Sequence, residues 1–279
     1  MVDGEWKMQD TGNERMFVMM KRITVIMFIV FSCVVSAKAE DASLVTRFCY
    51  DVQDDYMNFY SWGNLGMLGG GFVVGGIIAN SSIDGDINEW YTNDVKSADT
   101  DDISEVVKEF GNGLITLPLF IGAGALSAFS EDSAVCEVVG EWGQKSLRAV
   151  LVGAPPMLAL SIVTGGSRPS DEEGDSKWQP FKDGNGVSGH SFMGAVPFIT
   201  AAKMADDPGL KVLFYAGSAL CGISRINDGD HYFSQSLLGW WIAYLSASSV
   251  DKTRNGGRIA GMTPIIMNDC TGVGYMMEF

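Results

Sequence analysis

The stretch VLFYAGSALCGISRINDGDHYFSQSLLGWWIAYLSASSV, residues 212–250, decides the expected fold. Two apolar segments rich in Ala, Leu, Gly and Ser flank a short polar turn. Strand-like alternation is weak in both segments, so the pattern predicts two buried helices joined by that turn. The turn contains Ser224 and Arg225 and ends at His231, one of only two histidines in the chain.

Three more apolar segments of helical length precede this pair, over residues 114–129, 149–167 and 191–202. Ala, Leu, Gly and Met dominate them, which again favours helices over strands. Pro155 and Pro156 are expected to kink or break the second segment, because proline lacks a backbone N–H and clashes with the preceding turn. The sequence therefore predicts an all-α bundle.

An export signal is expected over residues 1–39. A basic pair precedes the apolar run 23–35, and Ala-Lys-Ala before Glu40 is typical of a signal-peptidase site. An uncleaved anchor and a lipoprotein cysteine at Cys33 are the alternatives. The start of the signal is taken to be Met16, Met19 or Met20, because the residues before Met16 are polar.

The remaining chain is divided into three parts. Residues 40–110 are expected to form a helical region that packs on the core. Residues 111–255 are expected to form the helical core with the active site, and residues 256–279 a C-terminal tail. Basic residues recur at alternate ends of the apolar segments, as the positive-inside tendency would place them. A soluble periplasmic protein and a membrane-embedded bundle are both open, and nothing indicates an oligomeric state.

Charge and cysteine patterns exclude some classes of function. With 34 acidic and 19 basic residues, the chain has a formal net charge of −15. Nucleic-acid binding needs basic surfaces that neutralise phosphates, so a nucleic-acid partner is not expected. No CxxC motif or Cys/His cluster suggests zinc.

Three short motifs that suit phosphate binding lie at the edges of apolar segments. The first is Arg168-Pro169, the second is Ser188-Gly189-His190, and the third joins Ser224-Arg225 to His231. If successive helices alternate in direction, all three motifs lie at one end of the bundle. Each motif alone is common, but together they gather both histidines of the chain beside anion-binding groups.

The residue types indicate phosphoryl chemistry without a metal ion. Arg168 and Arg225 can each give a two-pronged hydrogen bond to phosphate oxygens. Ser188 and Gly189 precede a helix, where free N–H groups and the helix dipole favour an anion. One histidine can attack phosphorus while the other protonates the leaving oxygen. The arginines supply the positive charge that Mg²⁺ would otherwise bring, so no metal or cofactor is expected.

The order RP, SGH and SR-x5-H resembles the type 2 phosphatidic acid phosphatase superfamily, which includes class A acid phosphatases and vanadium haloperoxidases. The resemblance implies a bundle of about six core helices. It implies His231 as nucleophile and His190 as general acid. Phosphate-binding residues on the same pattern are Arg168, Ser188, Gly189 and Arg225.

Three positions depart from the family pattern. Ser161 stands where the family has lysine, Val187 where it has proline, and Gln235 where it has aspartate. Gln235 can still accept a hydrogen bond from His231 and orient it, but it brings no charge. Lys177 or Lys182 could replace the missing lysine.

We therefore expect an exported, metal-independent phosphatase acting on a phosphorylated small molecule or a lipid or isoprenoid (pyro)phosphate. The active site would face outside the cytoplasm, either in the periplasm or at a membrane. Two alternatives are kept. One is a phosphate-binding protein of the same fold whose catalysis has decayed, and the other is a haloperoxidase that would take vanadate as cofactor.

Overall fold

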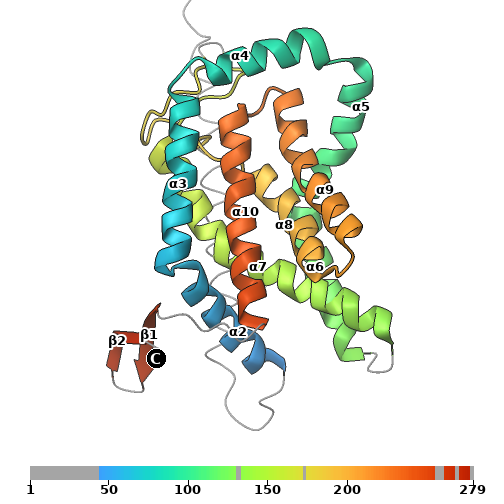
Figure 1. Ribbon diagram of the computed structural model, residues 1–279, viewed down its shortest axis with the longest axis vertical. Coiled ribbons are helices and arrows are strands. Elements are labelled where there is room, and N and C mark those ends of the chain that lie inside the picture. Colours follow the sequence, from blue (N-terminus) through green and yellow to red (C-terminus); the bar gives the residue numbers. More distant parts are fainter. Residues whose placement is uncertain (1–43, 130–132, 172–173, 255–260, 268–269, 277–279) are drawn as a thin grey trace, which may run out of the picture. The chain divides into compact units, whose positions relative to one another are not determined.

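The computed structural model describes residues 44–129, 133–171, 174–254, 261–267 and 270–276, so the expected export signal lies outside the described residues. The helices are α2 (Leu44–Phe59), α3 (Trp62–Ala79), α4 (Ile83–Trp90), α5 (Ala98–Val107), α6 (Gly113–Phe129), α7 (Ala134–Thr164), α8 (Gly189–Met204), α9 (Pro208–Asn227) and α10 (Phe233–Arg254) (Figure 1). A π-helical turn, Tyr91–Val95, follows α4, and a 3-10 turn, Lys108–Gly111, follows α5. Residues 52–279 form one unit, within which the packing described below occurs.

Helix α10 lies at the centre of the bundle and packs against α3, α7, α8 and α9 (Figure 1). Its side chains Leu238, Ile242 and Leu245 are fully buried, and Phe192 and Ile199 of α8 join them. Removal of these large apolar groups from water supplies the main driving force for assembly. The predicted all-α fold class is confirmed.

Small residues allow the helices to approach closely. A Cβ atom at Gly153 of α7 would collide with the Phe192 ring of α8, and one at Gly194 of α8 would collide with Cys221 of α9. The Gly- and Ser-rich composition of the apolar segments thus reflects tight contacts between helices rather than loops. Close packing of α7, α8, α9 and α10 brings the ends that carry the three motifs together.

Three details of local structure add to the sequence analysis. Helix α7 runs as one helix through Pro155 and Pro156 and packs against α6, α8 and α10, so the predicted break does not occur. Ser97 caps α5, in a capping box with Thr100. The C-terminal residues form an antiparallel pair of strands, β1 (Gly261–Met267) and β2 (Cys270–Met276).

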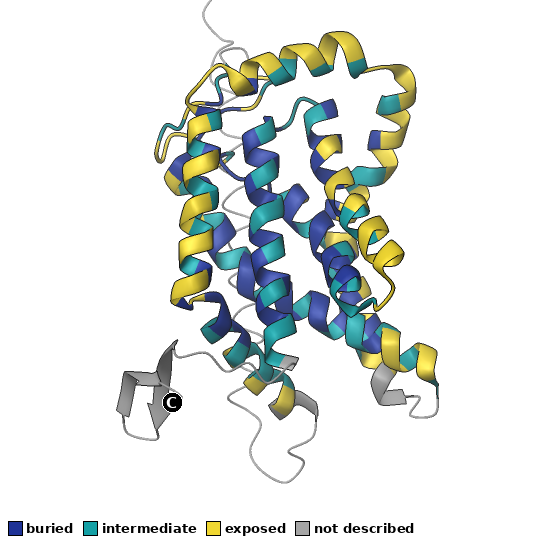
Figure 2. Cartoon of the chain, viewed as in Figure 1, coloured by how far each residue is buried: buried dark blue, intermediate teal, exposed yellow. Residues whose placement is uncertain are grey.

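The outer faces of several helices are exposed (Figure 2), and many of the exposed residues are large and apolar. Helices α3 and α7 are long and apolar enough to cross a membrane, and α5 with its 3-10 turn and α6 would form a third, bent span. The exposed apolar residues on α3, α6 and α9 include Trp62, Val73, Val74, Ile77, Leu114, Ile115, Leu119, Ile121, Val212 and Leu213. The composition is therefore compatible with membrane association.

Helices α4 and α5 contact the turn between α9 and α10 through hydrogen bonds. The buried carboxylate of Asp84 on α4 accepts hydrogen bonds from the Ser234 N–H (2.9 Å) and hydroxyl (2.5 Å), at the start of α10. On α5, the Ser104 hydroxyl donates to the Asp228 carboxylate over 2.6 Å. These two contacts fix both sides of the turn that contains His231.

Candidate active site

His231 is buried in the turn between α9 and α10 and is held by Gln235 one helical turn further on. Its Nδ1 atom lies 2.9 Å from Gln235 Oε1. The same oxygen accepts the backbone N–H of Tyr232 (3.1 Å), and the Nε2 group of Gln235 donates to the Ser167 carbonyl (3.0 Å). The Gln235 amide can therefore sit in only one orientation.

That orientation selects the tautomer of His231. Because Oε1 can only accept, Nδ1 of His231 must carry the proton, and Nε2 keeps its lone pair. A neutral amide thus performs the orienting part of the role that a carboxylate has in the family pattern. It brings no negative charge to stabilise a charged imidazole.

Burial lowers the pKa of His231 to about 3. The hydrogen bond to Gln235 opposes this shift, while the charges of Arg168, Arg225 and His190 add to it. The buried ring is therefore neutral at ordinary pH, which is the form that a nucleophile requires.

His190 lies in the first turn of α8, exposed on one side to solvent. Desolvation of the ring is the largest cause that lowers the pKa of His190 to about 4, and the charge of Arg225 is the next. Ser188 caps the helix by accepting the Ser191 N–H at 3.3 Å, and its own N–H donates to the Gln235 carbonyl at 2.9 Å. The N–H groups of Gly189 and His190 have no acceptor within the described residues, so both can receive an anion.

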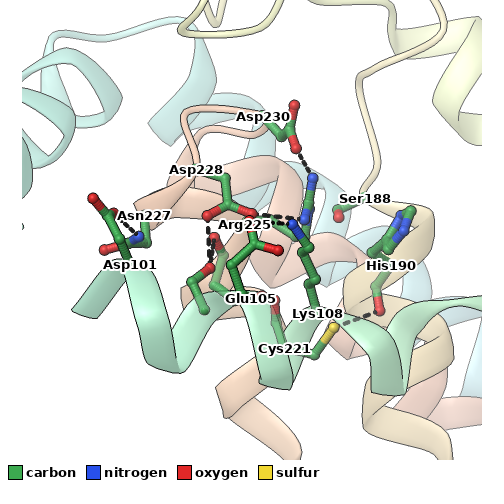
Figure 3. Close-up of polar contacts among 12 residues, drawn as sticks. Asp101, Glu105, Lys108, Ser188, His190, Cys221, Arg225, Asn227, Asp228 and Asp230 are labelled. Atoms are coloured by element: carbon green, nitrogen blue, oxygen red, sulfur yellow. Dashed lines mark hydrogen bonds and ion pairs between the residues drawn. The ribbon is translucent and has the colours of Figure 1, made fainter. Parts of the chain in front are cut away.

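The two predicted phosphate-binding arginines both contact Asp230, in the turn between α9 and α10. Arg225, at the end of α9, donates to Asp228 (3.0 Å) and also contacts Asp230. Arg168 reaches Asp230 over 3.4 Å and Asn185 over 3.3 Å. Figure 3 shows Arg225 between the two aspartates, with Ser188 and His190 beyond it. Neither aspartate takes the place of the missing carboxylate beside His231.

Ser161 stands at the position of the family lysine, and it bonds to the backbone of the segment before Ser188. Its hydroxyl donates to the carbonyls of Gly184 and Val187, and it accepts the Val187 N–H at 3.4 Å. These contacts fix the segment that leads into Ser188. A lysine here could not make the same compact set of bonds.

A cation near the pocket comes from a part of the chain that the motifs do not include. Lys108 follows α5 and forms an ion pair with Glu105 over 2.6 Å. Its charge also lowers the pKa of His190, after the larger effects of desolvation, Arg225 and Arg168. It points toward Arg225 (Figure 3). Lys177, by contrast, is exposed and paired with Asp175 at 3.2 Å. No sequence signal marked Lys108, because it lies 60 residues before Arg168 and outside any motif.

The structure thus brings the seven predicted residues together at one end of the bundle. They are Arg168, Ser188, Gly189, His190, Arg225, His231 and Gln235. Their roles stay predictions. Ser167 and Lys108 lie beside these residues and were not predicted. Asp230 was expected as a possible substitute for the missing carboxylate beside His231, and it pairs with the two arginines instead. Among the described residues, no group of three or more His, Cys, Asp or Glu side chains is arranged to hold a metal ion.

Comparison with known proteins agrees with this geometry. Residues 147–254 match the PAP2 superfamily. The resemblance inferred from the three motifs is confirmed, since the matched segment contains all of them. The match supports a phosphatase-type activity with phosphorylated substrates. No curated protein and no solved structure gave a match.

Proposed function

We propose that the protein is a metal-independent phosphatase that works through a phosphohistidine. The arrangement of His231 carries the proposal. Gln235 fixes its tautomer and leaves the Nε2 lone pair free, and the charges of Arg168 and Arg225 act on the ring. The free N–H groups that begin α8 supply further donors for an anion. An oriented neutral imidazole in a cationic pocket is what nucleophilic attack on a phosphate ester needs.

The first step forms the phosphoenzyme. The Nε2 lone pair of His231 attacks phosphorus, and the bond from phosphorus to the leaving oxygen breaks with its electron pair on oxygen. Protonated His190 donates a proton to that oxygen, and Arg168 and Arg225 neutralise charge on the other phosphoryl oxygens.

The second step returns the enzyme to its starting state. His190, now neutral, removes a proton from water, and the water oxygen attacks phosphorus. The bond between phosphorus and His231 Nε2 breaks, and inorganic phosphate leaves. Gln235 holds the ring throughout, so Nε2 stays directed at the phosphoryl group.

We further propose a membrane lipid phosphate as substrate, hydrolysed outside the cytoplasm. Exposed apolar surfaces on α3 and α6 favour contact with lipid. A surface hollow is lined by Phe72, Val73, Gly76, Ile77, Asn80 and Trp178. Because most of these residues are apolar, the hollow suits the apolar tail of a lipid substrate. The test compares a lipid phosphate in mixed micelles with a soluble ester of the same head group. Equal kcat/KM for both would contradict the lipid preference.

The deciding experiment for the chemistry uses the purified full chain and an aryl phosphate. We expect His231→Ala to abolish hydrolysis, and EDTA to leave the wild-type rate unchanged. Acid-labile label from ³²P-substrate should be trapped on the wild type and not on His231→Ala. Activity in the His231→Ala variant would refute the assignment. Phosphate binding without turnover of any ester would instead favour the decayed, phosphate-binding alternative.

A further inference from the structure

The Asp230 carboxylate bridges the two arginines that the proposed function assigns to phosphate. Arg168 Nη1 lies 3.4 Å from one oxygen, and Arg225 Nη2 contacts the other. Two guanidinium groups that converge on one carboxylate are also placed to hold a phosphoryl group, because both anions accept paired N–H donors in the same way. The carboxylate therefore occupies a position that suits the phosphoryl oxygens of a substrate.

Unlike Asp230, the neighbouring Asp228 is anchored to helix α5. Asp228 accepts both Arg225 and the Ser104 hydroxyl of α5, at 3.0 and 2.6 Å. The Asp230 carboxylate contacts only the two arginines within the described part of the chain, and its side chain is 27% exposed. Gly229 precedes it with φ of +68°, a conformation that glycine adopts without strain. Asp230 can therefore turn toward water while Asp228 keeps Arg225 in place.

From this geometry we propose that Asp230 is an internal anion that occupies the phosphate position in the unliganded protein and is displaced by the substrate. This inference rests on the proposed function. Arg225 is buried, and its carboxylate partners keep its charge neutralised when no phosphate is bound. When phosphate enters, the arginines exchange one anion for another, so no buried charge is left without a partner at any stage.

The exchange has a consequence for turnover. Asp230 competes with substrate and product alike, so it weakens binding of both and returns to the arginines as inorganic phosphate leaves. Removing its charge should lower the KM for substrate and the inhibition constant for phosphate by a similar factor. Hydrogen bonds between charged groups suggest about a tenfold change.

The test measures binding of inorganic phosphate to the full chain by calorimetry, without turnover. We expect Asp230→Asn and Asp230→Ser to bind phosphate about tenfold more tightly than the wild type. Glu109→Gln is the matched control. It removes one negative charge that acts on His190. The Glu109 carboxylate accepts a hydrogen bond from Asn112, and among the described residues it contacts neither arginine. Its effect should stay below about twofold.

A double-mutant cycle separates displacement from simple charge repulsion. If Asp230 must leave Arg168, then Arg168→Ala costs more phosphate affinity in the Asp230→Asn background than in the wild type, by about threefold or more. Equal costs in both backgrounds, or equal affinities of Asp230→Asn and wild type, would overturn the inference while leaving the phosphatase proposal intact. Failure of every variant and of the wild type to bind phosphate would overturn both.

Discussion

Two arginines near opposite ends of the bundle are both buried and both paired with carboxylates, yet their surroundings differ. Arg148 of α7 forms two hydrogen bonds with Asp55 of α2, each 2.7 Å long, and the Asp55 carboxylate is fully buried. Thr253 of α10 donates to the same carboxylate at 2.7 Å. Arg225 at the other end has partners that are 22% and 27% exposed.

The difference separates a structural ion pair from an exchangeable one. With both charges enclosed, the Arg148–Asp55 pair has no route for another anion, so it can only fix α2, α7 and α10 to one another. Around Arg225 the carboxylates face water and can be rehydrated at little cost. Burial of the cation alone, with open partners, is what an anion-binding pocket requires.

Of the two arginines, Arg225 should have the larger effect on activity. We expect Arg225→Ala to lower kcat/KM about 10³-fold or more, because it removes a charged donor from the transition state. The unfolding free energy should change much less, since the freed aspartates are already partly hydrated. A loss of stability as large as the loss of activity would contradict the comparison.

Arg148 should behave in the opposite way. We expect Arg148→Ala to lower the free energy of unfolding by about 3–5 kcal/mol, because it leaves the Asp55 carboxylate buried without its arginine. Thermal or denaturant unfolding measures this change. The kcat per folded molecule should stay within about twofold of wild type, and a selective loss of kcat would show that this end of the bundle takes part in catalysis.

Substitutions of Gln235 test whether a neutral side chain that orients His231 is enough for catalysis. We expect Gln235→Leu to lower kcat about 100-fold, because His231 loses the partner that fixes its tautomer. Gln235→Glu keeps the length and adds charge, so it should raise the pKa of His231 from about 3. NMR titration of the ring would detect the shift. An unchanged kcat in Gln235→Leu would remove Gln235 from the mechanism.

The depressed pKa of His190 predicts a pH dependence for substrates with poor leaving groups. As general acid, His190 must be protonated, and in the free enzyme its pKa is about 4. The ratio of kcat/KM for an alkyl phosphate to that for an aryl phosphate should therefore fall up to tenfold per pH unit above about pH 4. The aryl ester is the control, because its leaving group needs little protonation. A ratio independent of pH would exclude His190 as the acid.

Lys108 should have the smallest effect. We expect Lys108→Ala to raise KM about three- to tenfold, because it removes one positive charge from the edge of the pocket. Lys177→Ala is the matched control, since Lys177 pairs with Asp175 on the loop surface, and it should leave KM within about twofold. The reverse order of effects would restore Lys177 as the substitute for the family lysine.

Much of the fold and the outline of the site followed from the sequence. Apolar segments of helical length predicted the bundle, and three short motifs predicted Arg168, His190, Arg225 and His231. These features are local, because helix formation and motif spacing depend on neighbouring residues. Helix α7 shows the limit of local reasoning. Its proline pair predicted a kink or a break, and no break occurs, since α7 runs as one helix that packs on three others.

Contacts between distant residues needed the tertiary structure. The sequence marked Gln235 as a substitution for aspartate, but only the fold places its amide between His231 and the Ser167 carbonyl, 68 residues away. Likewise, only the folded chain brings Arg168 to Asp230, 62 residues further on. The sequence by itself determined that both histidines, Arg168 and Arg225 stand in phosphate-binding motifs. The tertiary structure decided which of them face one another, because charge pairing and burial depend on distances that no local pattern encodes.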